Sequence, residues 1–185
     1  MKRLPLVVLG TVAILLFSTI PQYSVADTAP SYITQWGSQG LQVTGLFSFP
    51  QDVAVDSAGN IYVSDFGNRR IQKFDNDGDF LHTWGIKGSG NGQFQAPAGI
   101  TVGGDYVYVV DNDLNRVQKF DTVGKYITQW GIKGQGRGQF MLPQGIAVDS
   151  FSDVYVVETG NSRIQKFRSN GTFLLSWGIS GLEKG

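Results

Sequence analysis

A period of 46 to 48 residues dominates the sequence and limits the folds that it can adopt. Four tryptophans, each followed by glycine, mark the period at Trp36, Trp84, Trp130 and Trp177. The segment RIQKF at 70–74 returns as RVQKF at 116–120 and as RIQKF at 163–167. Self-similarity at a fixed period of this length is the signature of repeat architectures, in which each unit packs against its neighbours.

Each repeat predicts four short β-strands. In the first complete repeat we expect strands at 52–56, 61–64, 70–74 and 80–84, where apolar and polar residues alternate between turns rich in Gly, Asn and Asp. Four antiparallel strands per repeat are typical of propeller blades. The prediction is therefore an all-β fold, a β-propeller with three full blades and one stray N-terminal outer strand at 32–36. The boundaries are 27–46 for the N-terminal segment and 47–93, 94–139 and 140–185 for the repeats.

The repeat resembles a known family. Phe47 to Pro50 form a Phe-x-x-Pro element, followed by VAVD at 53–56, IYVSD at 61–65, an Asn-x-Arg run into RIQKF, and Trp-Gly. This order resembles the NHL repeat over residues 32–185. The resemblance implies a β-propeller, commonly with six blades. Three positions depart from the pattern: Gly103 replaces an aspartate, Glu158 replaces another, and Leu114 replaces an asparagine.

Three blades are fewer than a closed ring needs, because closed propellers have at least four. Two explanations remain open. Either the sequence is a piece of a longer protein, or two copies associate head to tail as a homodimer that completes a six-bladed ring.

The N-terminus predicts export from the cytoplasm. Lys2 and Arg3 precede an apolar run at 4–20, and Ser24-Val25-Ala26 places small residues before the expected cleavage site. Residues 1–26 are thus predicted to be a signal peptide. The alternative is an uncleaved membrane anchor at 4–20. Removal of 1–26 leaves two more acidic than basic residues, which argues against a nucleic-acid partner.

Each repeat also contains a carboxylate five residues before an arginine. Because the pair recurs in every repeat, we interpret it as part of the blade structure, not as an acid–base pair of a single active site. The three pairs are Asp65 with Arg70, Asp111 with Arg116, and Glu158 with Arg163.

Other motifs are set aside as structural. The glycine-rich segments 88–92 and 134–138 lack the following helix that a phosphate loop requires, so they are predicted to be inter-blade turns. The acidic segment 75–79 lacks the glutamate that closes a calcium loop, and is predicted to be a hairpin turn. His82 is the only histidine, and there is no cysteine. We therefore expect no catalytic residue, metal or cofactor.

Function is expected where the repeats differ. The turns between the second and third strands and the inter-blade loops should emerge on one face, which is predicted to be polar with one exposed aromatic side chain. Such a face is able to bind a protein, a peptide or a glycan. The candidate residues are Phe66, Arg69, Asn112, Asp113, Thr159, Ser162, Lys87, Lys133, Gln135 and Arg137.

The resemblance implies an interaction module, because NHL propellers are mostly binding platforms. The sequence is accordingly interpreted as an extracytoplasmic binding or scaffolding protein. One alternative is a fragment of a secreted propeller lyase of the peptide-amidating type. That resemblance implies a metal held by several histidines, whereas this chain has one. RNA binding, known for intracellular NHL domains, is the less favoured alternative.

Overall fold

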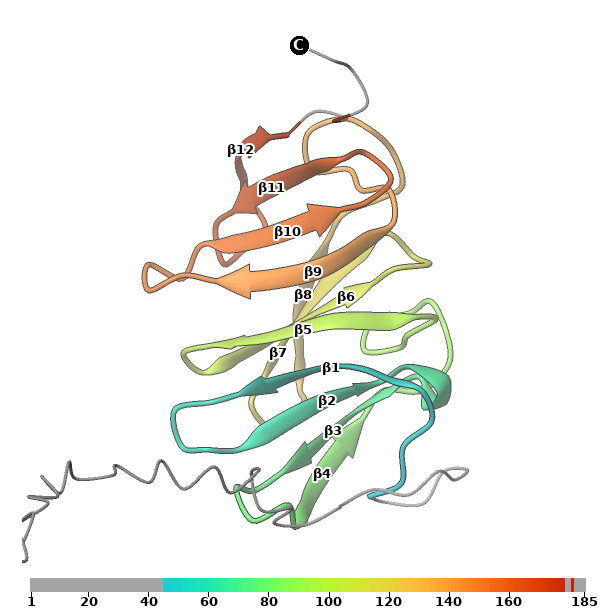
Figure 1. Ribbon diagram of the computed structural model, residues 1–185, viewed down its shortest axis with the longest axis vertical. Helices are drawn as coiled ribbons and strands as arrows, with labels where there is room; N and C mark the ends of the chain where they lie inside the picture. The colour runs from blue at the N-terminus through green and yellow to red at the C-terminus, as the bar shows by residue number, and fades with distance from the viewer. Residues whose placement is uncertain (1–44, 179–180, 182–185) are drawn as a thin grey trace, which may run out of the picture. The chain divides into compact units, whose positions relative to one another are not determined.

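A computed structural model describes residues 45–178 and Gly181. The expected signal peptide at 1–26 and the stray strand at 32–36 lie outside this part of the chain. The described residues form three four-stranded antiparallel sheets (Figure 1). Blade 1 comprises β1 (Pro50–Val55), β2 (Ile61–Asp65), β3 (Arg70–Phe74) and β4 (Phe80–Trp84); blade 2 comprises β5 (Pro97–Gly103), β6 (Tyr106–Asp111), β7 (Arg116–Asp121) and β8 (Tyr126–Trp130); blade 3 comprises β9 (Pro143–Val148), β10 (Val154–Glu158), β11 (Arg163–Phe167) and β12 (Phe173–Trp177).

The blades follow one another in sequence order, and their first strands β1, β5 and β9 lie side by side (Figure 1). Two polar contacts join β1 and β2 of blade 1 to β5. The backbone N–H of Ile100 donates to Asp52 Oδ2 over 2.9 Å, and the Ser64 hydroxyl donates to the Ala98 carbonyl over 2.6 Å. Consecutive four-stranded sheets with adjacent inner strands are the blades of a propeller. The predicted fold class is therefore confirmed.

The strands of blade 1 lie close to their predicted positions. The strand β1 begins at Pro50 instead of at 52, because Pro50 pairs with Asp65 across a β-bulge. A single 3-10 turn, η1 (Phe66–Asn68), follows β2 and is the only helical element among the described residues. Period-two alternation between turn residues was sufficient to place these strands in the sequence.

Apolar side chains fill the space between neighbouring blades. One cluster joins Tyr62 and Ile71 of blade 1 to Val107, Val109 and Phe120 of blade 2. A second cluster of the same kind joins blade 2 to blade 3. The core of this fold is thus a series of interfaces between sheets, as expected for a repeat protein in which each unit contacts only its neighbours.

The Trp-Gly and Phe-x-x-Pro elements meet in space. Phe94 and Phe140 are fully buried, and each lies beside the glycine that follows the preceding outer strand. A Cβ atom on Gly85 would lie 2.7 Å from the Phe94 ring, and one on Gly131 would lie 2.4 Å from the Phe140 ring. Both glycines also have a positive φ, 95° and 102°. Glycine is therefore required there both by the backbone conformation and by the aromatic ring.

The structure explains why Gly103 replaces an aspartate. In blade 3, the corresponding Asp149 accepts a hydrogen bond of 2.7 Å from the Tyr155 hydroxyl, and this contact lowers the pKa of Asp149. A Cβ atom at Gly103 would lie only 2.5 Å from Cγ1 of Val148 in the next blade. Close packing of blade 2 against blade 3 therefore excludes the aspartate from this position.

Candidate functional site

One end of the blades carries all the turns between second and third strands together with the inter-blade loops. The register shows this directly, since Pro50 at the start of β1 pairs with Asp65 at the end of β2. Asp65 in turn pairs with Arg70, and Ile71 pairs with Trp84, the last residue of β4. We call this end of the blades the loop face. The hairpins that join the first strand of each blade to the second lie at the opposite end.

The repeated carboxylate–arginine pair is buried beneath the loop face. In blade 1, Arg70 Nε lies 2.8 Å from Asp65 Oδ2, and in blade 3, Arg163 Nε lies 2.7 Å from Glu158 Oε1. Asp65 also accepts a hydrogen bond of 2.7 Å from the Ser48 amide. A buried carboxylate needs several donors of this kind to offset its desolvation.

The carboxylate–arginine pair of blade 2 is longer than the pairs of the other two blades. Arg116 Nη2 lies 3.8 Å from Asp111 Oδ2, beyond hydrogen-bonding distance. Leu114 occupies the position where Asn68 and Asn161 donate to the carboxylates of the other two blades. Burial raises the pKa of Asp111, although the amides of Gln95 and Ala96 and the charge of Arg116 act in the opposite direction. The departure at Leu114 thus coincides with the weakest of the three pairs.

The arginines also fix the glycine-rich loops. Arg116 donates to the carbonyl oxygens of Ser89, Gly90 and Gln93, at distances of 2.7 to 3.0 Å. Arg163 makes the equivalent contacts to the loop that precedes blade 3. A phosphate site needs backbone N–H groups that point inward at the anion. In these loops, backbone carbonyl groups point at the positively charged arginine side chains instead. The loops therefore connect blades, in agreement with the interpretation from the sequence.

A shallow hollow lies where the inner strands reach the loop face. Its volume is about 430 Å³, and all three blades contribute to it. Two candidate residues, Phe66 and Asn112, meet in this hollow. The prediction that Phe66 is an exposed aromatic is wrong, because its side chain is half-buried there. The remaining lining residues are Gln51, Asp52, Ala98, Gly99, Gln144 and Gly145.

The other candidates do not form one site. Arg69 and Lys87 share a separate hollow on blade 1, and Gln135 and Ser162 share another on blade 3. Arg137 lies over the Phe173 ring, 5.7 Å from its centre. Asp113, Lys133 and Thr159 are exposed, and none of them lines a described hollow on the loop face.

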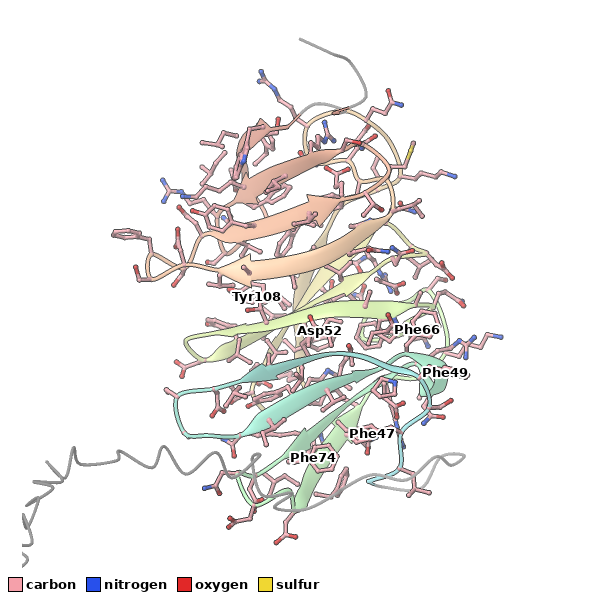
Figure 2. All side chains as sticks on the ribbon, in the orientation of Figure 1. Phe47, Phe49, Asp52, Phe66, Phe74 and Tyr108 are labelled. Carbon is pink, nitrogen blue, oxygen red and sulfur yellow. The ribbon has the colours of Figure 1, made fainter. Side chains whose placement is uncertain are left out.

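Sequence reasoning missed the most exposed aromatic residue of the loop face. Phe49 is 70% exposed, and Figure 2 shows it at the same end of blade 1 as Phe66. Leu142, at the equivalent position of blade 3, is 50% exposed. Both have a positive φ, 48° and 50°, which is uncommon for large side chains. The signal was present, because the residue before the repeated proline differs in every blade: Phe49, Ala96 and Leu142.

The motifs set aside from the sequence occupy structural positions. Asp75 accepts hydrogen bonds from the amides of Asp77 and Asp79, as in a hairpin turn. The exposed His82 ring stacks on Trp84 with a distance of 6.1 Å between ring centres. Among residues 45–178 no group of three potential metal ligands comes together. Within the same part of the chain, no helix has the length and apolarity needed to span a membrane.

Comparison with known families agrees with the repeat. Residues 47–74 match the family model of the NHL repeat, and residues 94–176 match a family model described as a 6-bladed beta-propeller. Residues 47–74 are thus an NHL repeat. Human NHL repeat-containing protein 3 is 51% identical over 39 residues, which are 20% of this chain and 11% of that protein.

Several solved structures resemble this chain in fold. Virginiamycin B lyase from Staphylococcus aureus has a TM-score of 0.59 at 20% identity, covering 77% of this chain and 45% of the lyase. Hydrazine synthase from Kuenenia stuttgartiensis has a TM-score of 0.59 at 16% identity, covering 77% and 39%. The chain spans less than half the length of each of these two proteins. At such identities the likeness establishes the fold and leaves function to be argued from the site.

Proposed function

We propose that the loop face is the binding surface of an extracytoplasmic, non-enzymatic interaction module that recognises a protein or a peptide. The observation that carries the proposal is the pair of large apolar side chains, Phe49 and Leu142, exposed beside the hollow-forming strands β1 and β9. Aromatic and aliphatic anchors surrounded by polar groups are typical of protein-binding surfaces.

Polar groups in the hollow supply specificity for such a ligand. Asn112 donates from Nδ2 to the Pro143 carbonyl over 2.8 Å, so its side chain is fixed in position. Asp52 places a carboxylate in the same hollow. A fixed amide, a carboxylate and the half-buried Phe66 ring together suit a peptide backbone with one apolar and one basic or polar side chain.

Replacement of Phe49 by serine is expected to weaken peptide binding at least tenfold, because it removes the exposed aromatic anchor. The probe is a displayed library of random peptides selected on the wild-type protein, with the affinities of selected peptides then measured by calorimetry. The matched control is Phe151→Ser, since Phe151 is 83% exposed in the turn between β9 and β10, at the opposite end of the blades. Equal loss in both variants, or a library from which the wild-type protein selects no peptide, contradicts the proposal.

The extracytoplasmic location leads to a separate prediction. When the full chain is produced in a host with a general export pathway, its mature N-terminus is expected to be Asp27, as read by N-terminal sequencing. The variant Ala26→Phe should still be exported but remain uncleaved, because signal peptidases require a small residue there. A wild-type protein found with residues 1–26 intact in the cytoplasm would contradict the proposed location.

A further inference from the structure

The separate hollow on blade 1 gathers positive charge at the loop face, and we call it the cationic hollow. Its volume is about 530 Å³, and it lies between the turn after β2 and the residues that follow β4. Its described lining includes the cationic side chains of Arg69, Arg70 and Lys87 and no carboxylate. Arg70 is neutralised by Asp65, 2.8 Å away. The charges of Arg69 and Lys87 remain, since neither residue forms an ion pair within the described part of the chain.

Arg69 is held in place by its own turn. Its Nη1 donates to the Gly67 carbonyl over 2.9 Å, and its φ of 55° lies in the left-handed region. Its Nε is buried and has no acceptor among residues 45–178. A guanidinium carries five N–H groups in a rigid fork. Most of the donors of Arg69 are therefore available to an anion that enters the cationic hollow.

The combination of Arg69 and Lys87 is specific to blade 1. In blade 2, Lys133 has the place of Lys87 and makes the same backbone pairing across the inter-blade loop. However, Asn115 stands at the position of Arg69 in that blade, and Ser162 stands there in blade 3. Residues that build the blade are expected to recur in every repeat. The uncompensated charge of the cationic hollow is thus not part of the repeated blade structure.

A short side chain keeps the cationic hollow open beside Trp84. Thr83 lines the hollow, and its hydroxyl donates to the Ile71 carbonyl of its own sheet over 2.8 Å. At the position of Thr83, blade 2 has Gln129, whose Oε1 accepts a hydrogen bond of 2.6 Å from Arg116 Nη1. Blade 2 thus places a long side chain with its own acceptor among the cationic groups, whereas Thr83 of blade 1 is shorter and is turned to the backbone.

The donors of the cationic hollow favour a carboxylate over a phosphate. A phosphate site uses converging backbone N–H groups. The amides of the turn already have acceptors, because Gly67 donates to the Ser48 carbonyl over 2.7 Å and Arg69 donates to a carbonyl of its own turn over 3.1 Å. The side-chain cations remain, and the guanidinium fork matches the two oxygens of a carboxylate. Trp84 and Ile86 add apolar surface for the methylene groups of an acidic side chain.

We propose that the cationic hollow binds a carboxylate, and that the loop face therefore recognises an acidic peptide. The inference rests on the proposed function of the loop face. The two hollows adjoin, because Phe66 lines the hollow at the inner strands and Gly67, the next residue, lines the cationic hollow. A peptide whose apolar residue lies against Phe66 thus places a neighbouring Asp or Glu beside Arg69 and Lys87.

The first test uses small anions and needs no peptide. Backbone amide signals of the purified protein are followed by NMR while sodium chloride is replaced by sodium acetate, or by sodium sulfate, at constant ionic strength. Acetate is expected to shift the amide signals of Gly67 and Ile86 in a saturable way, because both residues line the cationic hollow. A sulfate affinity more than tenfold above that of acetate would assign the hollow to a tetrahedral oxoanion and overturn the carboxylate site.

The test variant combines Arg69→Asn with Lys87→Gln and should abolish the acetate shifts. Asparagine suits the backbone at position 69, since Asn115 has a φ of 51° at the equivalent position of blade 2. The matched control is Lys133→Gln, which removes the equivalent lysine from a blade without the arginine. It should leave the acetate shifts unchanged.

The second test uses peptides selected from the displayed library on the wild-type protein. These peptides should be enriched in Asp and Glu, and the double variant should bind them at least tenfold more weakly than the wild-type protein does. Replacing the acidic residue of a peptide by its amide should cause a similar loss on the wild-type protein. On the double variant, the same replacement should cause no further loss, because the partner charges are already absent.

The outcomes separate this inference from the proposed function. Where peptides are selected, the comparison of each acidic peptide with its amide decides: equal binding to the wild-type protein overturns the carboxylate site and leaves the peptide-binding function intact. Where no peptide is selected, the proposed function fails and the acetate titration decides. Saturable shifts that the double variant abolishes then establish a carboxylate site, whereas shifts that are absent or that persist in the double variant overturn it.

Discussion

Replacement of Asp65 by asparagine is expected to lower the free energy of unfolding by about 3 kcal/mol, the scale for breaking a buried ion pair. Its carboxylate accepts hydrogen bonds from Ser48, Asn68, Arg70 and Gln72, and every one of these partners is a donor. Asparagine offers one acceptor oxygen and an NH2 group, which would face donors. The variant therefore loses the charge opposite Arg70 and at least one hydrogen bond.

The matched variant is Asp111→Asn, which should cost only about 1 kcal/mol, the scale for one hydrogen bond. Arg116 is 3.8 Å from Asp111 and keeps its loop carbonyls and Gln129 as acceptors. Burial already raises the pKa of Asp111, so the neutral amide avoids a desolvation cost that the carboxylate bears. Urea unfolding at one fixed protein concentration measures both variants. Equal losses would contradict the argued difference between blades.

Most of the blade architecture was predictable from the sequence. Short runs of strand-forming residues between turns rich in Gly, Asn and Asp placed β3 and β4 at their observed bounds. The Trp-Gly element marked the period of the repeat in the sequence, and the structure adds that Gly85 makes room for Phe94. That second role is not readable from one repeat, because it joins the end of one repeat to the beginning of the next.

The polar contacts were harder to predict. The sequence identified Asp65 and its counterparts only as partners of an arginine five residues later. In the structure their principal amide donors come from the preceding loop: Ser48 for Asp65, Gln95 and Ala96 for Asp111, and Met141 for Glu158. These partners lie 15 to 17 residues away in the chain. Spacing alone identifies a repeated pair but not the third group that the fold brings to it.

The loop face shows a further limit of prediction from the sequence. Phe66 was expected to be exposed because it lies in a turn and has no aromatic counterpart in the other blades. The structure places it partly inside the hollow, whereas Phe49, which has a positive φ, is the exposed aromatic residue of this face. Variation between repeats therefore locates the candidate face, but which of its side chains are exposed depends on backbone conformation.

Truncation of Phe140 to alanine is expected to lower the free energy of unfolding by about 3 to 5 kcal/mol, as for other fully buried aromatic residues. Phe140 is fully buried between blades 2 and 3, with its ring centre 5.5 Å from that of Phe167. The adjacent Gly131 has no side chain that could fill the cavity, and its backbone conformation is fixed.

The control for this variant is Phe151→Ala, because Phe151 carries the same side chain in an exposed turn of blade 3. The free energy of unfolding of this control variant should fall by no more than about 0.5 kcal/mol, as for surface substitutions in general. Both are measured by urea unfolding at the same protein concentration, since association shifts apparent stability by mass action. A loss below 1 kcal/mol for Phe140→Ala would mean that the blades do not depend on this aromatic contact. The interfaces between sheets would then not be the core of the fold, because each repeat supplies a phenylalanine at the position of Phe140 to its interface with the preceding blade.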